Sequence, residues 1–124
     1  MYNQKRAMVF IILIVVVSFA CYSTKEREKL VFSPDQLPAV EKGEYYEVTI
    51  SISQTETPVG EFRISEGELP PGLVLEQDPA DSNKATISGI ATESGNYFFT
   101  IYVWCYGTSR NGQTGEMQYS IEVR

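Results

Sequence analysis

The run GNYFFTIYVWCY, residues 95–106, is the clearest indication of the fold in this sequence. Its side chains alternate along the run, and glycines stand at both ends, Gly95 and Gly107. Because successive side chains of a β-strand point to opposite faces, this period of two predicts a long strand over residues 96–106. The inward row is expected to be Tyr97, Phe99, Ile101, Val103 and Cys105, and the outward row Phe98, Thr100, Tyr102, Trp104 and Tyr106.

Shorter runs of the same kind predict the remaining strands. Residues 45–53, 85–89 and 116–123 alternate in this way, and residues 62–64 and 73–75 do so more briefly. A short edge strand is expected over residues 30–32. The nine Gly and six Pro cluster between these runs, where turns are needed. About seven strands with turns at this spacing predict an all-β, antiparallel sandwich.

Residues 1–20 have the pattern of a secretory signal peptide. Residues 1–6 are polar and end in Lys5 and Arg6, and residues 7–17 are all apolar. That apolar run is shorter than the ~20 residues a membrane-spanning helix needs. A basic start, a short apolar run and a small residue at its end are typical of a cleaved leader. An uncleaved membrane anchor is the alternative interpretation.

The end of that run, Ser18-Phe19-Ala20-Cys21, resembles the lipobox of bacterial lipoproteins. Ala20 and Cys21 match the pattern, whereas Ser18 stands where an aliphatic residue is usual and Phe19 is bulky. The resemblance implies acylation of Cys21, for example with palmitate, and a new N-terminus there. The chain would then divide into a signal peptide at 1–20, a charged tether at 21–29 and a domain at 30–124. An ordinary leader that leaves Cys21 a plain thiol is the alternative.

The composition argues against an enzymatic function and against nucleic-acid binding. The chain carries ten Lys and Arg against sixteen Asp and Glu, a net charge of −6, and no histidine. An acidic surface repels nucleic acid at long range, and without histidine the usual general base and commonest metal ligand are missing. We therefore expect a non-enzymatic protein without a cofactor. Cys105 lies in an apolar run, which predicts a buried, structural thiol.

The run LPPGL at residues 69–73 is the first part of a wider pattern. It is followed by Ile87-Ser88-Gly89, by Gly95 and by residues 97–103, and preceded by Gly43-Glu44-Tyr45-Tyr46. Together these resemble the bacterial immunoglobulin-like domains related to the cadherin-like domains of dystroglycan type. The resemblance covers residues 37–123 and implies an immunoglobulin-like sandwich without shared catalytic residues. Gly89 and Gly95 are expected to adopt backbone conformations that disfavour a Cβ.

The outward row of the long strand is the candidate functional site. Four large aromatic side chains are unusual on a face expected to meet water, and Tyr and Trp are common at binding hot spots. The row therefore predicts a partner-binding surface at Phe98, Tyr102, Trp104 and Tyr106. The alternative is that the tether, the 107–115 loop or cross-strand aromatics such as Tyr45 cover them.

The loop after residue 75 holds four oxygen-bearing residues that are candidates for weak calcium binding: Glu76, Asp78, Asp81 and Asn83. Calcium needs ~6–8 oxygen ligands in a defined shell, and this spacing matches no known calcium motif. These residue types are ordinary turn formers, so turn formation is the preferred interpretation and no metal site is predicted.

Taken together, the sequence predicts a lipid-anchored protein of the cell envelope, on the outer membrane and facing the periplasm. Its function would be non-catalytic binding of an envelope protein or glycan. A structural or accessory subunit of a larger envelope assembly is the alternative, in which the aromatic face is buried permanently.

Overall fold

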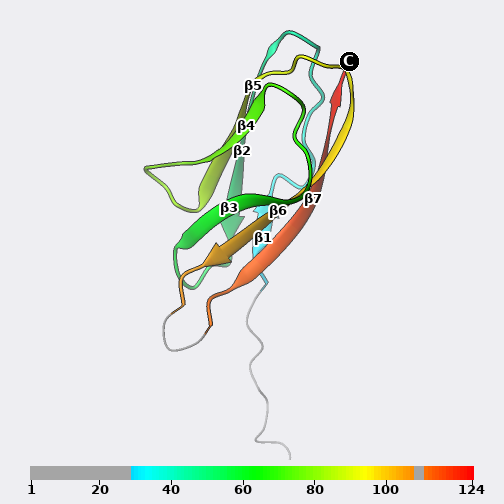
Figure 1. Cartoon of the computed structure of the whole chain (residues 1–124). Helices are drawn as coiled ribbons and strands as arrows, with labels where there is room; N and C mark the ends of the chain where they lie inside the picture. The colour runs from blue at the N-terminus through cyan, green and yellow to red at the C-terminus, as the bar shows by residue number, and fades with distance from the viewer. Residues whose placement is uncertain (1–28, 108–110) are drawn as a thin grey trace, which may run out of the picture.

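The structure is a computed structural model, and it describes residues 29–107 and 111–124. These residues form seven strands and no helix (Figure 1). The strands are β1 (Val31–Ser33), β2 (Tyr45–Ser53), β3 (Val59–Gly67), β4 (Leu73–Gln77), β5 (Lys84–Ile90), β6 (Gly95–Cys105) and β7 (Thr114–Val123). The described part of the chain thus contains no helix long and apolar enough to cross a membrane.

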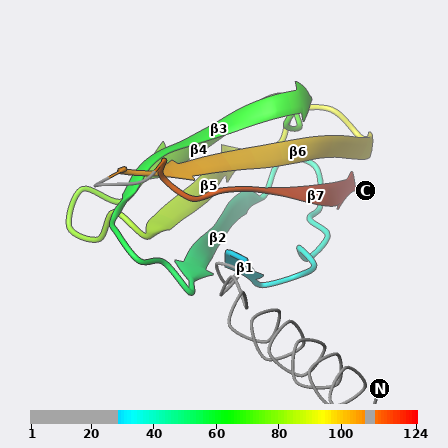
Figure 2. The same cartoon turned by 90° about the horizontal axis from the view of Figure 1, so that it is seen from below.

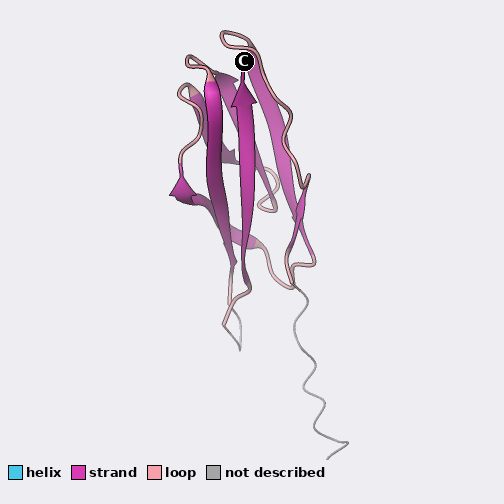
Figure 3. Ribbon diagram, turned by 90° about the vertical axis from the view of Figure 1, so that its right-hand side faces the viewer, coloured by secondary structure: helices cyan, strands magenta, loops and turns pink. Residues whose placement is uncertain are grey.

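The strands pair into two antiparallel sheets. One sheet has the order β1-β2-β5-β4 and the other the order β3-β6-β7, and in Figure 2 they form two layers. The strands of both layers run along the long axis of the molecule (Figure 3). Labelled A to G in chain order, these are the A-B-E-D and C-F-G sheets of constant-type immunoglobulin domains. The predicted all-β, immunoglobulin-like sandwich is confirmed.

The core lies between the two sheets and consists of the inward rows of the strands. On β6 the expected row is confirmed, since Phe99, Ile101, Val103 and Cys105 are all buried and Tyr97 packs against them. The β1-β2-β5-β4 sheet contributes Tyr46, Ile50, Ile52, Leu73, Ala85 and Ile87. Burial of these apolar surfaces is the main source of stability, at about 25 cal/mol per Å² removed from water.

The segment between β1 and β2 changes sheets. β1 pairs with β2, but Val40 forms a parallel bridge with Val123 at the end of β7. Two core tyrosines hold the crossing: the Tyr119 hydroxyl donates to the Pro34 carbonyl at 2.7 Å, and the Tyr46 hydroxyl donates to the Pro38 carbonyl at 3.1 Å. The N-terminal part of the domain is therefore tied to both layers.

The leucines of the 69–73 run and the two predicted turn glycines have the structure that the sequence indicates. Leu73 is buried and Leu69 packs against the core. Gly89 and Gly95 have φ of +136° and +148°, so both backbone expectations are confirmed. Gly89 lies inside β5, however, where its backbone faces Gly72 too closely for a Cβ. At the start of β6 the Tyr97 hydroxyl donates to the Glu93 carbonyl at 3.1 Å, which is the tyrosine corner of immunoglobulin-like domains.

Some strand limits differ from the sequence expectation. β3 has nine residues, because Val59 and the polar residues after Ile64 also pair with β6. β7 begins at Thr114, since Thr114 and Gly115 extend the ladder opposite Trp104 and Val103, so the connection before it is shorter than expected. The predicted signal peptide at 1–20, Cys21 and most of the tether at 21–29 lie outside the described residues.

Candidate functional site

The four candidate aromatic residues share the outward face of the β3-β6-β7 sheet, which we call the outer face. Phe98 is 70% exposed and Tyr106, just beyond the end of β6, is 54% exposed. Tyr102 and Trp104 are half-buried. Strand alternation therefore places the row as expected, although its members differ in how freely they meet solvent.

Trp104 is held in place by β3. The register sets Glu61 opposite Trp104, and the indole Nε1–H donates to Glu61 Oε2 at 3.0 Å. The six-membered part of the ring occupies the space beside Gly60 where a Cβ would sit. Tyr106 contacts the indole edge-on, with ring centroids 5.2 Å apart. Such aromatic pairs add about 0.5–1.5 kcal/mol beyond their buried area, so Trp104 has a fixed orientation.

Tyr102 is paired with a cation on the same neighbouring strand. Arg63 lies opposite Tyr102 in the register, and its guanidinium carbon is 4.5 Å from the ring centroid. A cation at this distance over an aromatic face is attracted by the ring's quadrupole. On the other side of Tyr102, the register places Glu116 of β7. The Trp104 end of the outer face is thus a set of mutually partnered side chains.

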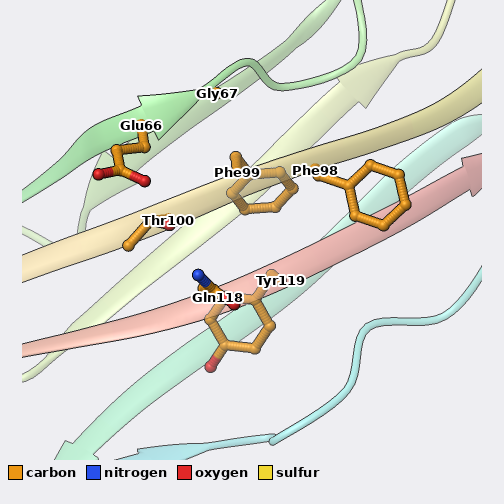
Figure 4. A pocket seen from close by; sticks show the side chains of 7 residues that line it. All are labelled: Glu66, Gly67, Phe98, Phe99, Thr100, Gln118 and Tyr119. Carbon is orange, nitrogen blue, oxygen red and sulfur yellow. The ribbon is translucent and has the colours of Figure 1, made fainter.

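Phe98 has no such partners. It forms no ring contact with any described residue, and it lies at one end of a hollow of about 280 Å³ (Figure 4). Thr100 lies between Glu66 and Gln118, which are its register partners on β3 and β7. A second hollow, of about 510 Å³, adjoins Phe98 and Gln118 and includes Asp35.

The Cys105 thiol lies inside the sandwich. Cys105 is 2% exposed, and burial raises the pKa of its thiol above the ordinary value of 9.0. The thiol is therefore protonated near neutral pH and acts as a small apolar side chain. Among the described residues Cys105 is the one cysteine, and its thiol is free there.

The loop considered for calcium uses its oxygens for turns. Asp78 Oδ1 accepts from the backbone N–H groups of Ala80 and Asp81, at 2.7 and 3.3 Å. Asp81 Oδ1 accepts from the Asn83 N–H at 3.0 Å. Across residues 29–107 and 111–124, no group of three or more His, Cys, Asp or Glu side chains is arranged to hold a metal ion. The loop therefore has the geometry of a turn.

One proposed cover for the aromatic row is wrong. Tyr45 belongs to β2 in the other sheet, where it pairs with Ile90 and donates to Glu47, so it cannot lie across from β6.

The sequence prediction also missed five residues of the outer face: Gly60, Glu61, Arg63, Glu66 and Gln118. The alternation of β3 and β7 places them outward, but only the register shows which β6 side chain each one meets.

Comparisons with known proteins identify the fold. No protein-family model matches the sequence, and no curated protein matches it. Among solved structures, the SrpA adhesin from Streptococcus sanguinis superposes with a TM-score of 0.58 at 14% identity, over 82% of this chain and 59% of that chain. An endo-fucoidan hydrolase of glycoside hydrolase family 107 gives 0.57 at 16% identity, over 82% of this chain and 14% of that chain.

A third similar structure is the PapD-like domain 7 of human CEP192. It has a TM-score of 0.50 at 16% identity, over 83% of this chain and 91% of that one. The chain thus spans 14% of the hydrolase and 59% of the adhesin. At these identities the likeness shows the sandwich fold and nothing about activity.

Proposed function

We propose that this protein is a non-catalytic binding module that recognises an envelope protein or glycan through its outer face. The observation that carries the proposal is the aromatic row of β6, with Phe98 70% exposed at one end and an oriented Trp104 at the other. The Trp104 ring is already held by Glu61 and Tyr106, so it loses little conformational freedom on binding, which favours affinity.

Two further observations support this class of function. The sequence contains no histidine to act as a general base. The Cys105 thiol is buried and its pKa is raised, so it is a poor nucleophile. A structural or accessory subunit is the second candidate, because a permanent partner would cover the same aromatic row.

We also propose export and anchoring of the chain. The leader pattern of residues 1–20 and the Ala20-Cys21 pair support a lipoprotein acylated at Cys21, in the cell envelope on the outer membrane. Two or more acyl chains give stable anchoring, whereas a single chain holds only marginally. The resemblance to dystroglycan-type cadherin-like domains fits a surface module of this kind.

Truncation of the two ends of the row tests the binding function. We expect Phe98→Ala and Trp104→Ala each to weaken capture of the envelope partner by about thirtyfold, because a hot-spot aromatic contributes ~2 kcal/mol or more. Phe98→Ala should change the free energy of unfolding by less than about 0.5 kcal/mol, as is usual for exposed positions. Trp104→Ala should cost about 1–2 kcal/mol of stability, because it loses the Glu61 hydrogen bond and its packing on Gly60.

Tyr45→Ala is the matched control, because Tyr45 is 64% exposed but lies on the opposite sheet. Partner capture is measured with the full chain against detergent-solubilised envelope, and stability by urea unfolding. Equal capture by the two outer-face variants and the control would overturn the proposal. Co-purification of the partner with the chain at fixed stoichiometry through size exclusion would favour the accessory-subunit candidate.

A further inference from the structure

We propose that the hollow beside Phe98 binds a lysine or arginine side chain of a basic segment in a protein partner. This inference rests on the proposed binding function and narrows it, because it selects a cationic polypeptide over a neutral glycan. It also places the specific contact at the Phe98 end of the outer face, about 20 Å along β6 from Trp104 at ~3.3 Å per residue.

The hollow has a defined floor and walls. Thr100 is only 6% exposed although it belongs to the outward row, so it lies deeper than its neighbours. Figure 4 shows Glu66 and Gln118 on opposite sides of Thr100, with Phe98 farther along β6. Because all these residues lie in paired strands, the sheet fixes the spacing of their backbone positions before a ligand arrives.

The polar groups of these walls form no side-chain hydrogen bond or ion pair within residues 29–107 and 111–124. Glu61 accepts from Trp104 and Arg63 packs over Tyr102, whereas the Glu66 carboxylate and the Gln118 amide have no such partner among the described side chains. A lysine side chain combines an apolar stem with an ammonium head that has three donors. Its stem would pack on Phe98 while its head donates to Glu66 and to the Gln118 amide oxygen.

Charge complementarity extends beyond this one contact. The second hollow, on Phe98 and Gln118, includes Asp35, which also forms no ion pair with a described residue. An extended segment that crosses Phe98 would therefore meet a carboxylate in each hollow. The net charge of −6 adds long-range attraction for a basic segment. A neutral glycan can donate its hydroxyl groups to these carboxylates, but it gains nothing from their negative charge.

The test measures binding of a short fluorescent peptide of alternating lysine and valine to the full chain in a neutral detergent. Fluorescence anisotropy at physiological ionic strength gives the affinity. We expect Glu66→Gln to weaken binding at least about tenfold, because a charge-assisted hydrogen bond is lost. Phe98→Ala should weaken it similarly. Glu76→Gln removes the same charge from β4 of the other sheet and should change the affinity less than about twofold.

Three outcomes would overturn the inference. Equal losses in Glu66→Gln and Glu76→Gln would mean that only the overall charge attracts the peptide. Equal binding of the same peptide with acetylated lysines would mean that the cation is not recognised, and absence of binding by the wild-type chain would remove the site. The partner-capture experiment separates the two proposals. If capture still depends on Phe98 and Trp104, the proposed function stands although the lysine site fails. If capture depends on neither residue, the proposed function fails as well.

Discussion

At the residue scale, the orientation of the single tryptophan depends on a glycine on the neighbouring strand. Gly60 leaves open the space that the Trp104 ring fills, and Glu61 accepts the indole N–H at 3.0 Å. β3 is an edge strand of its sheet, and a glycine there weakens a strand unless an aromatic ring from the adjacent strand covers it. Gly60 and Trp104 therefore compensate each other.

Gly60→Ala tests this pairing. The new Cβ would overlap the indole ring and displace it, so the Glu61 hydrogen bond and the ring packing are lost together. We expect the free energy of unfolding to fall by about 1–2 kcal/mol and the tryptophan emission to shift to longer wavelength as the ring enters water. Gly43→Ala is the control: its φ of +86° disfavours a side chain but no atom lies nearby, so it should lose stability without changing the emission. Unchanged emission in Gly60→Ala would contradict the pairing.

At the scale of the elements, the sequence predicted strands better than it predicted their contacts. The period of two in residues 97–105 identifies β6 and its inward row, because alternation is a local property. The register of β3 against β6 depends instead on bulges near Gly60 and Ser65, where the pairing shifts between Val59 and Glu61 and between Ile64 and Glu66. Local sequence does not specify these shifts, so the Glu61–Trp104 pair and the hollow at Thr100 were not predictable.

The crossing segment between β1 and β2 also depends on nonlocal contacts, through the hydroxyls of Tyr46 and Tyr119. Burial raises the pKa of both phenols to about 12 from an ordinary value of 10.0, and the charge of Asp35 adds to the effect at Tyr119. The folded state therefore holds these protons more tightly than the unfolded state does. Their contribution to stability is fully present below pH 10 and is lost as the pH rises through 12.

Alkaline unfolding measures this contribution. We expect the wild-type free energy of unfolding, from urea titrations, to decline as the pH rises above 10.0. The double variant Tyr46→Phe/Tyr119→Phe should lose about 1 kcal/mol per missing hydrogen bond at neutral pH but decline less steeply above pH 10. Burial also raises the pKa of the Cys105 thiol. Cys105 therefore adds to the alkaline loss of stability in both the wild type and the double variant. The same slope in wild type and variant would exclude the two phenols as the cause.

At the scale of the whole molecule, the two ends of the sandwich have different surroundings. β1 follows the predicted tether, and Leu30 and Phe32 lie beside Gly115 near the start of β7. β6 ends and β7 begins at this same end, so Trp104 and Tyr106 lie near it, while the C-terminus is at the opposite end (Figure 1). An acyl group on Cys21 would thus place Trp104 nearer the membrane than Phe98.

Lipidation of Cys21 is the prediction on which this orientation depends. The apolar run at residues 7–17 is shorter than the ~20 residues that a membrane-spanning helix needs, so the sequence favours an acyl anchor at Cys21 over a retained helix. We expect the intact mass of the membrane-extracted protein to correspond to a chain that begins at Cys21 and carries acyl groups. Cys21→Ser should abolish the acyl mass, whereas Cys105→Ser, the chain's other cysteine, should keep it. A mature protein that retains residues 1–20 would contradict both the cleavage and the anchor.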